Sequence, residues 1–187
     1  MRLRRAALLT MATVLVAGAC SKKQPPAPPA PPPPAPREQP APVRTADPDS
    51  ARRAEEARLA RERAELMTTL QEMIFFDYDD SRIRQDGQAA LSRKVPILRA
   101  NPGVTLRIVG HADERGSLEY NLALGMRRAR AVRDYLANFG IDASRLTTDS
   151  MGEERPLDPG HDEAAWARNR RAEFNVTGGA GNLVRGQ

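Results

Sequence analysis

An aspartate and an arginine that could bind one small ligand lie in the segment from Gly110 to Arg128, which reads GHADERGSLEYNLALGMRR. Asp113 lies on an acid-rich loop between an apolar strand pattern and a long amphipathic helical pattern. Asn121 and Arg128 share one face of that helix, because seven residues make two turns. A carboxylate accepts an ammonium group, and a guanidinium fork binds a carboxylate. The segment predicts a pocket for a ligand that carries both groups, and a structural Asp113–Arg128 ion pair is the alternative.

The two histidines could in principle support catalysis instead. His111 lies near Asp113, and His161 precedes two carboxylates, so a hydrolytic or metal cluster can be drawn on paper. These histidines stand on separate segments without metal-ligand spacing, and no serine-elbow motif occurs. We therefore expect a binding protein without catalytic residues, metal or cofactor, and a hydrolytic enzyme is the alternative.

The elements that must position these residues follow from the spacing of apolar side chains. The pattern predicts strands over 73–78, 104–109, 145–151 and 171–176, and helices over 87–100, 118–139 and 160–168. Pro96 should bend the first helix unless a new turn starts there. The order β-α-β-α-β-β, with a short helix before the last strand, predicts an α+β fold. We expect a two-layer sandwich with one four-stranded mixed sheet and helices on one face.

The N-terminal part of the chain has the composition of an exported, tethered protein. Residues 1–19 combine arginines, an apolar run and small residues, which is the layout of a secretory signal peptide; an uncleaved anchor helix is the alternative. Cys20, the single cysteine, resembles the acylated lipobox cysteine of bacterial lipoproteins, which implies lipidation at Cys20. Twelve of the sixteen prolines lie in 20–48 and favour an extended polyproline II linker.

The rest of the chain divides into a helical linker, one domain and a tail. Residues 49–73 are rich in Ala, Arg and Glu, which favours a solvated helical linker over a dimerisation helix. Residues 74–177 form the domain, and the Gly-rich residues 178–187 are expected to be a flexible tail. The chain carries a net charge of +5, but the domain has 16 basic and 16 acidic residues. This balance argues against nucleic acid as a partner.

Three blocks of the domain carry a family resemblance. In chain order they are Tyr78-Asp79, then Gly110-His111-Ala112-Asp113-Glu114-Arg115-Gly116 with Glu119-Tyr120-Asn121, Leu124-Gly125 and Arg127-Arg128-Ala129, and finally Gly160-His161-Asp162-Glu163-Ala164-Ala165 with Asn169-Arg170-Arg171-Ala172. The ordered set resembles the OmpA-like C-terminal domain family, and within it the peptidoglycan-associated lipoproteins. The resemblance covers 74–177 and implies an OmpA-like peptidoglycan-binding domain.

The resemblance also implies a ligand and a role for each site residue. The ligand is the meso-diaminopimelate side chain of the peptidoglycan stem peptide, bound noncovalently. Asp113 matches the ammonium-binding aspartate of the family, and Arg128 matches its carboxylate-binding arginine. Asp79 matches a residue beside the ligand backbone, and Asn121 matches a supporting asparagine.

Location and partners are further implications of the resemblance. A lipid-anchored protein on the periplasmic face of the outer membrane would tether that membrane to peptidoglycan. The peptidoglycan-associated lipoproteins do so within a Tol-Pal system that serves envelope integrity and cell division, and a TolB-like periplasmic protein docks on the same face. A structural anchor of the OmpA family without Tol partners is the alternative, and a cell-wall hydrolase is the second.

Overall fold

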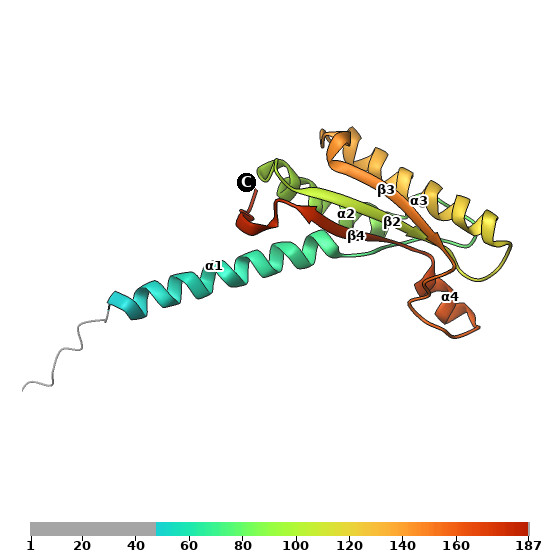
Figure 1. Ribbon diagram of the computed structural model, residues 1–187, viewed down its shortest axis with the longest axis horizontal. Coiled ribbons are helices and arrows are strands. Elements are labelled where there is room, and N and C mark those ends of the chain that lie inside the picture. The colour runs from blue at the N-terminus through green and yellow to red at the C-terminus, as the bar shows by residue number, and fades with distance from the viewer. Residues whose placement is uncertain (1–47, 187) are drawn as a thin grey trace, which may run out of the picture. The chain divides into compact units, whose positions relative to one another are not determined.

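The structure, a computed structural model, describes residues 48–186 (Figure 1). Its helices are α1 (Pro48–Gln71), α2 (Gln85–Ala100), α3 (Leu118–Asn138) and α4 (Glu163–Asn169). Its strands are β1 (Ile74–Phe75), β2 (Thr105–His111), β3 (Leu146–Gly152) and β4 (Arg171–Gly178). From β1 onward the elements follow the predicted order, with α4 as the short helix before the last strand. The predicted signal peptide (1–19), Cys20 and the Pro-rich linker up to residue 47 lie outside the described residues.

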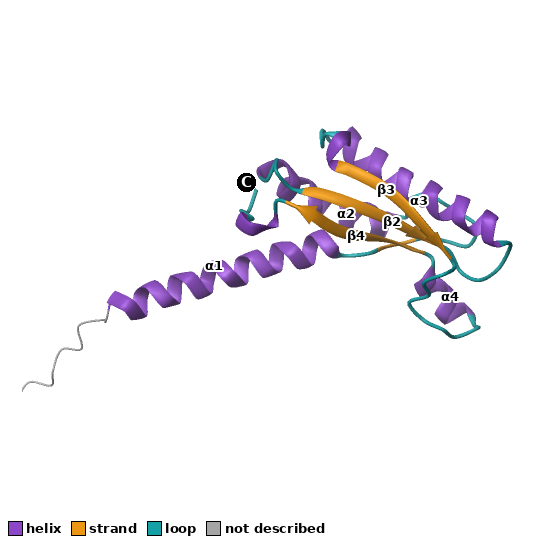
Figure 2. Cartoon of the chain, viewed as in Figure 1, coloured by secondary structure: helices purple, strands orange, loops and turns teal. Residues whose placement is uncertain are grey.

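The four strands form one mixed sheet in the order β1-β4-β2-β3. β2 pairs in parallel with β3 and antiparallel with β4, which also pairs antiparallel with β1. A parallel pair needs a crossover connection, and α3 provides it. Leu106 and Ile108 of β2 are buried in the core, whereas Arg107 between them is exposed. In the view of Figure 2, α2 and α3 lie behind the sheet, on the side of this core. The predicted α+β fold with one four-stranded mixed sheet is confirmed.

The first strand is much shorter than its apolar sequence predicts. Only Ile74 and Phe75 pair with β4, whereas the prediction extended the strand over 73–78. Phe76 keeps one backbone hydrogen bond, from its N–H to the carbonyl of Arg170 at 2.9 Å. The chain then turns away from the sheet, because the carbonyls of Asp77 and Asp80 accept hydrogen bonds from the buried guanidinium of Arg128.

Pro96 lies inside α2, which continues through it from Gln85 to Ala100. A proline in a helix interior lacks the N–H that would bond to the preceding turn and costs about 3 kcal/mol. Ile97 and Leu98, which follow it, are almost fully buried in the core. Burial of these two side chains offsets the lost hydrogen bond, so the helix does not end at the proline.

The predicted helical linker 49–73 is a linker only in its first part. The early turns of α1 are exposed, but Leu66 and Leu70 are buried in the domain core. Lys94 of α2 is fully buried, and its Nζ donates to the carbonyls of Thr69 and Leu70 in the last turn of α1 and of Glu72 just after it. The last turns of α1 therefore belong to the domain. No helix in the part of the chain that the structure describes is both long and apolar enough to cross a membrane.

The expectation of a flexible tail from residue 178 is wrong for the residues described up to 186. The turn Ala180–Asn182 leads to Leu183, which is 4% exposed and part of the core. Val184 exchanges two hydrogen bonds with the side chain of Asn101, at 2.8 and 2.9 Å. Arg185 forms ion pairs with Glu62 and Glu65 of α1. These contacts hold the C-terminal segment against α1 and the end of α2.

Candidate functional site

All four residues predicted to bind a ligand line one pocket of about 260 Å³. Its walls come from the β1–α2 loop, the β2–α3 loop and the first turns of α3. The lining residues are Tyr78, Asp79, Asp113, Arg115, Gly116, Tyr120, Asn121, Leu124 and Arg128. A wider hollow of about 560 Å³ lies along α1, but its lining is a single helix face and Arg185. The 260 Å³ pocket is the one in which buried charged groups converge.

A close contact between β2 and α3 sets the position of the helix in this pocket. A Cβ on Gly110 would overlap the carbonyl oxygen of Gly125, and a Cβ on Gly125 would lie 2.8 Å from the carbonyl oxygen of Gly110. Glycine at both positions lets the two backbones touch. One turn further along α3, Arg128 comes within hydrogen-bond reach of the carbonyl of His111 at the end of β2.

Arg128 is fully buried and held by three backbone carbonyls. Its Nη1 donates to His111 at 2.7 Å, its Nε to Asp80 at 2.8 Å and its Nη2 to Asp77 at 3.0 Å. Burial lowers the pKa of Arg128 to about 10, so the guanidinium stays charged at neutral pH. A guanidinium has five N–H groups, and these three bonds leave two for a ligand. The side chain therefore presents a preoriented cation in the pocket wall.

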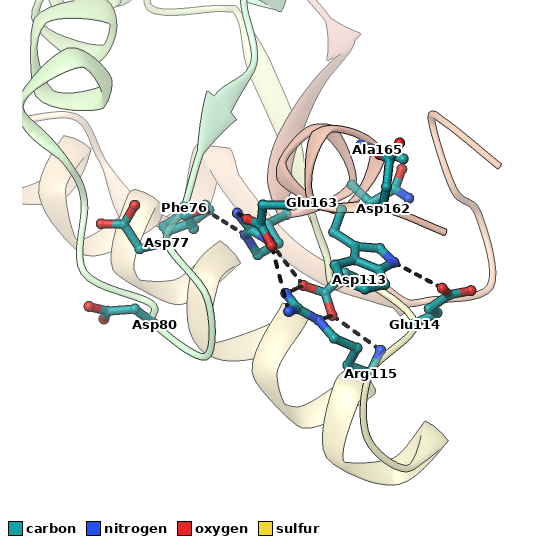
Figure 3. Close-up of polar contacts among 12 residues, drawn as sticks. Phe76, Asp77, Asp80, Asp113, Glu114, Arg115, Asp162, Glu163 and Ala165 are labelled. Carbon is teal, nitrogen blue, oxygen red and sulfur yellow. Dashed lines mark hydrogen bonds and ion pairs between the residues drawn. The ribbon is translucent and has the colours of Figure 1, made fainter. Parts of the chain in front are cut away.

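Asp113 is 4% exposed and does not form its ion pairs with Arg128. Its carboxylate accepts from the Nη2 of Arg115 at 2.7 Å, from the Nε of Arg115 at 3.1 Å and from the Nη1 of Arg170 at 3.3 Å (Figure 3). Burial alone would raise the pKa of Asp113, but these hydrogen bonds outweigh it and lower the pKa. The alternative of a structural Asp113–Arg128 ion pair is thus not what the structure contains.

Asn121 supports the loop that carries Asp113. The residue is 1% exposed, and its Nδ2 donates to the carbonyl of Asp113 at 3.1 Å and to that of Arg115 at 3.3 Å. The same amide also donates to the carboxylate of Glu153. Ser117 caps the helix by accepting from the N–H of Tyr120 at 3.2 Å. The loop and the start of α3 are therefore joined by side-chain hydrogen bonds.

Asp79 lies at the exposed rim of the pocket in an unusual backbone conformation. Its φ of +50° is left-handed, a region that aspartate tolerates better than most residues. The hydroxyl of Tyr120 donates to its carboxylate. The next residue, Asp80, accepts from the backbone and side chain of Arg82, and these bonds lower its pKa to about 2. The turn thus presents Asp79 to the pocket and Asp80 to Arg82.

The sequence analysis gave no role to Arg115, which the structure places at the centre of the site. Its guanidinium lies 4.0 Å from the ring centre of Tyr78 and 4.2 Å from that of Trp166. The spacing of Asp113 and Arg115 could have indicated their ion pair, because an arginine two residues after an aspartate in a short loop can fold its side chain back onto the carboxylate. Its aromatic neighbours come from segments far away in the chain, and no local pattern indicates them.

The two histidines lie near separate carboxylates, with the Nε2 of His111 3.7 Å from Glu173 and His161 beside Glu114, and among the described residues they form no shared cluster. His111 is buried, its ring nitrogens have no hydrogen-bond partner, and burial lowers its pKa to about 4. His161 is exposed and pairs with Glu114 at 2.7 Å. Across residues 48–186 there is no group of three or more His, Cys, Asp or Glu side chains placed to hold a metal ion.

The sequence of the domain is similar to that of known proteins. Residues 75–170 match the model of the OmpA family. A peptidoglycan-associated lipoprotein of Agrobacterium fabrum is 51% identical over 108 residues, which cover 58% of this chain and 60% of that protein. The chain thus spans less than two thirds of the length of this curated relative.

Two solved structures show the same fold. The peptidoglycan-associated lipoprotein of Burkholderia pseudomallei is 40% identical, has a TM-score of 0.56, and matches over 57% of this chain and 91% of its own. The cell wall anchor of the T6SS from Pseudomonas aeruginosa is 28% identical, has a TM-score of 0.50, and matches over 63% and 95%. The resemblance seen in the motifs is confirmed, and the chain belongs to the OmpA family.

Proposed function

We propose that this chain is a lipoprotein that binds peptidoglycan noncovalently and tethers the outer membrane to it. The observation that carries the proposal is the convergence of Asp113 and Arg128 on one pocket, with Asp79 and Asn121 in the same wall. The names of the peptidoglycan-associated lipoproteins among its relatives support the same ligand.

The ligand that fits this pocket is the free end of meso-diaminopimelate, where one carbon carries an ammonium and a carboxylate. The two remaining N–H groups of Arg128 can receive the carboxylate in a charge-assisted pair. Asp113 is the acceptor for the ammonium, and Asp79 at the rim faces the backbone of the stem peptide. Binding orders a polar group in a small pocket, so one site contributes modest affinity and many copies on one polymer add avidity.

The proposed role is mechanical and not catalytic. Acylation of Cys20 would hold the chain on the periplasmic face of the outer membrane, and the Pro-rich linker would span the distance to peptidoglycan. A TolB-like periplasmic protein is the proposed protein partner within a Tol-Pal system. An anchor without Tol partners has the same pocket, so capture of a TolB-like protein on the immobilised full chain separates the two: capture supports the Tol-Pal role, and its absence supports the simple anchor.

Co-sedimentation of the full chain with purified peptidoglycan sacculi tests the ligand. The wild type should sediment, whereas Asp113→Asn and Arg128→Lys should remain mostly in the supernatant. The exposed Arg130 lies on the same helix as Arg128, and Arg130→Gln is the control for loss of one positive charge. A tripeptide with meso-diaminopimelate should release the wild type, while the same peptide with lysine, which lacks the second carboxylate, should not. Failure of the wild type to sediment would rule out the proposal.

A further inference from the structure

The acceptor proposed for the ligand ammonium already carries a cation of the chain itself. Arg115 holds Asp113 by a two-pronged contact, with its Nε on one carboxylate oxygen and its Nη2 on the other. The backbone N–H of Arg115 adds a third bond at 3.1 Å, and Arg170 adds a fourth donor. An ionised carboxylate accepts about four hydrogen bonds, so these donors use its capacity. A ligand ammonium can bind Asp113 only if one donor leaves.

Of the two arginines on Asp113, Arg115 is the one that can leave. The Arg170 side chain is 7% exposed and fixed at both ends, by the carbonyl of Phe76 and by Glu163 at 2.6 Å. The Arg115 side chain is 29% exposed and itself lines the ligand pocket. Displacement of Arg115 needs no rearrangement of the core.

We propose that Arg115 is an internal competitor for the ligand ammonium and sets the specificity of the pocket. This inference rests on the proposed binding of diaminopimelate. In the free protein, the guanidinium of Arg115 occupies the position on Asp113 that the ammonium takes in the complex.

A second acceptor is present for the displaced guanidinium. The Nη1 of Arg115 lies 3.6 Å from a carboxylate oxygen of Glu163 on α4. Tyr78 and Trp166 lie 4.0 and 4.2 Å from the guanidinium, so a shift toward Glu163 moves it across these rings and changes its contact with Trp166. Figure 3 shows Asp113, Arg115 and Glu163 gathered at this point of the site.

The competition makes the pocket selective for a ligand with both charged groups. An ammonium that displaces Arg115 replaces one ion pair of Asp113 by another, so the ammonium contributes little to the binding free energy. A ligand carboxylate on Arg128 meets no such competitor, because the partners of Arg128 are backbone carbonyls. Binding free energy therefore depends on the carboxylate, and a lone amine such as a lysine side chain is rejected.

The test is a titration of the full chain with a tripeptide ending in meso-diaminopimelate and with its lysine analogue, followed by calorimetry. Loss of one partly exposed ion pair corresponds to a change of about two- to fivefold in affinity. Arg115→Gln should bind the diaminopimelate peptide tighter by that factor and should acquire measurable binding of the lysine peptide. Glu163→Gln removes the second acceptor and should bind the diaminopimelate peptide about threefold more weakly. Arg130→Gln should match the wild type.

Trp166 is the only tryptophan of the chain and reports on Arg115 directly. Its fluorescence should change when the wild type binds the peptide and should stay constant when Arg115→Gln binds it. Weaker binding by an Arg115→Gln variant of unchanged melting temperature would overturn the inference and make Arg115 a support of Asp113. In that case the wild type still binds the diaminopimelate peptide, so the proposed function stands and only the inference about Arg115 fails. Absence of binding by the wild type and every variant would instead overturn the proposed function together with the inference.

Discussion

The side chain of Lys94 closes the C-terminal end of α1, with its Nζ 2.6 Å from the carbonyl oxygen of Thr69. The last carbonyls of a helix have no partner within the helix, and the buried amino group of Lys94 satisfies them here. Burial lowers the pKa of Lys94 to about 7. The ring of Phe174 lies 4.4 Å from the same Nζ. The C-terminal end of α1 is thus fastened to the domain by a side chain of α2.

Lys94→Met should lower the free energy of unfolding by about 2–3 kcal/mol, because a methionine of similar length leaves the buried carbonyls unsatisfied. Urea unfolding followed by circular dichroism measures the change. Arg93→Met is a suitable control, since the neighbouring Arg93 is exposed and pairs with Glu72. Equal stability of Lys94→Met and the control would show that the cap contributes nothing.

His111 should make the domain sensitive to mild acid. Its pKa is lowered from 6.5 to about 4 by burial, and the positive charge of Arg171 adds to the effect. Between these pH values the unfolded chain binds a proton on His111 that the folded chain does not. The free energy of unfolding should therefore fall as the pH drops from 6.5 to about 4, by at most about 3 kcal/mol.

His111→Phe is the matching variant, because the ring nitrogens of His111 have no hydrogen-bond partner, and only a 3.7 Å contact of its Nε2 with Glu173 is lost. Its stability at pH 7 should equal or exceed that of the wild type, and the loss between pH 6.5 and 4 should be smaller. Thermal unfolding at a series of pH values gives both quantities. The same acid sensitivity in the variant would assign the effect to other groups.

The contact between Gly110 and Gly125 should tolerate no added methyl group. Gly110→Ala would force the carbonyl of Gly125 and with it α3 away from β2, at a cost of about 2–3 kcal/mol for overpacking. Because Arg128 follows Gly125 by one turn, binding to sacculi should weaken as well. Gly103→Ala is the control, since a Cβ at Gly103 meets no atom within 4 Å. The melting temperatures of both variants test the predicted loss of stability, and their co-sedimentation with sacculi tests the predicted loss of binding.

The elements, and the placement of Asn121 and Arg128 on one helix face, could be predicted because their signals are local. The alternation of Leu106 and Ile108 with Arg107 indicates a strand with one buried face, and Asn121 and Arg128 share a helix face by spacing alone. The predicted strand 73–78 failed beyond Phe75 because an apolar run does not show where the backbone leaves a sheet. Arg128, about fifty residues later in the chain, draws that backbone away.

The contacts that the sequence analysis missed join residues far apart in the chain. Val184 and Asn101 are 83 residues apart, and their hydrogen bonds order a segment whose glycines indicate flexibility. Lys94 and Thr69 are 25 residues apart, and a lysine in a helical pattern normally indicates an exposed position. The ion pair of Arg115 with Asp113 is local, but the contacts of Arg115 with Tyr78 and Trp166 depend on the tertiary fold.

Asn121→Asp should make the free energy of unfolding of the domain depend on pH through the new carboxyl group. The wild-type amide donates to two backbone carbonyls and to Glu153, and an ionised carboxylate of the same shape would face three acceptors. The loss at neutral pH should be about 3 kcal/mol, the cost of a buried charge without a partner. The new carboxyl group should therefore have a folded-state pKa above its ordinary value.

Protonation of this carboxyl group restores one donor, so the stability of the Asn121→Asp variant relative to the wild type should recover as the pH falls. Asn121→Leu, which has no donor at any pH, should show no such recovery in thermal unfolding, and a parallel loss in both variants would show that the amide's hydrogen bonds do not hold the loop.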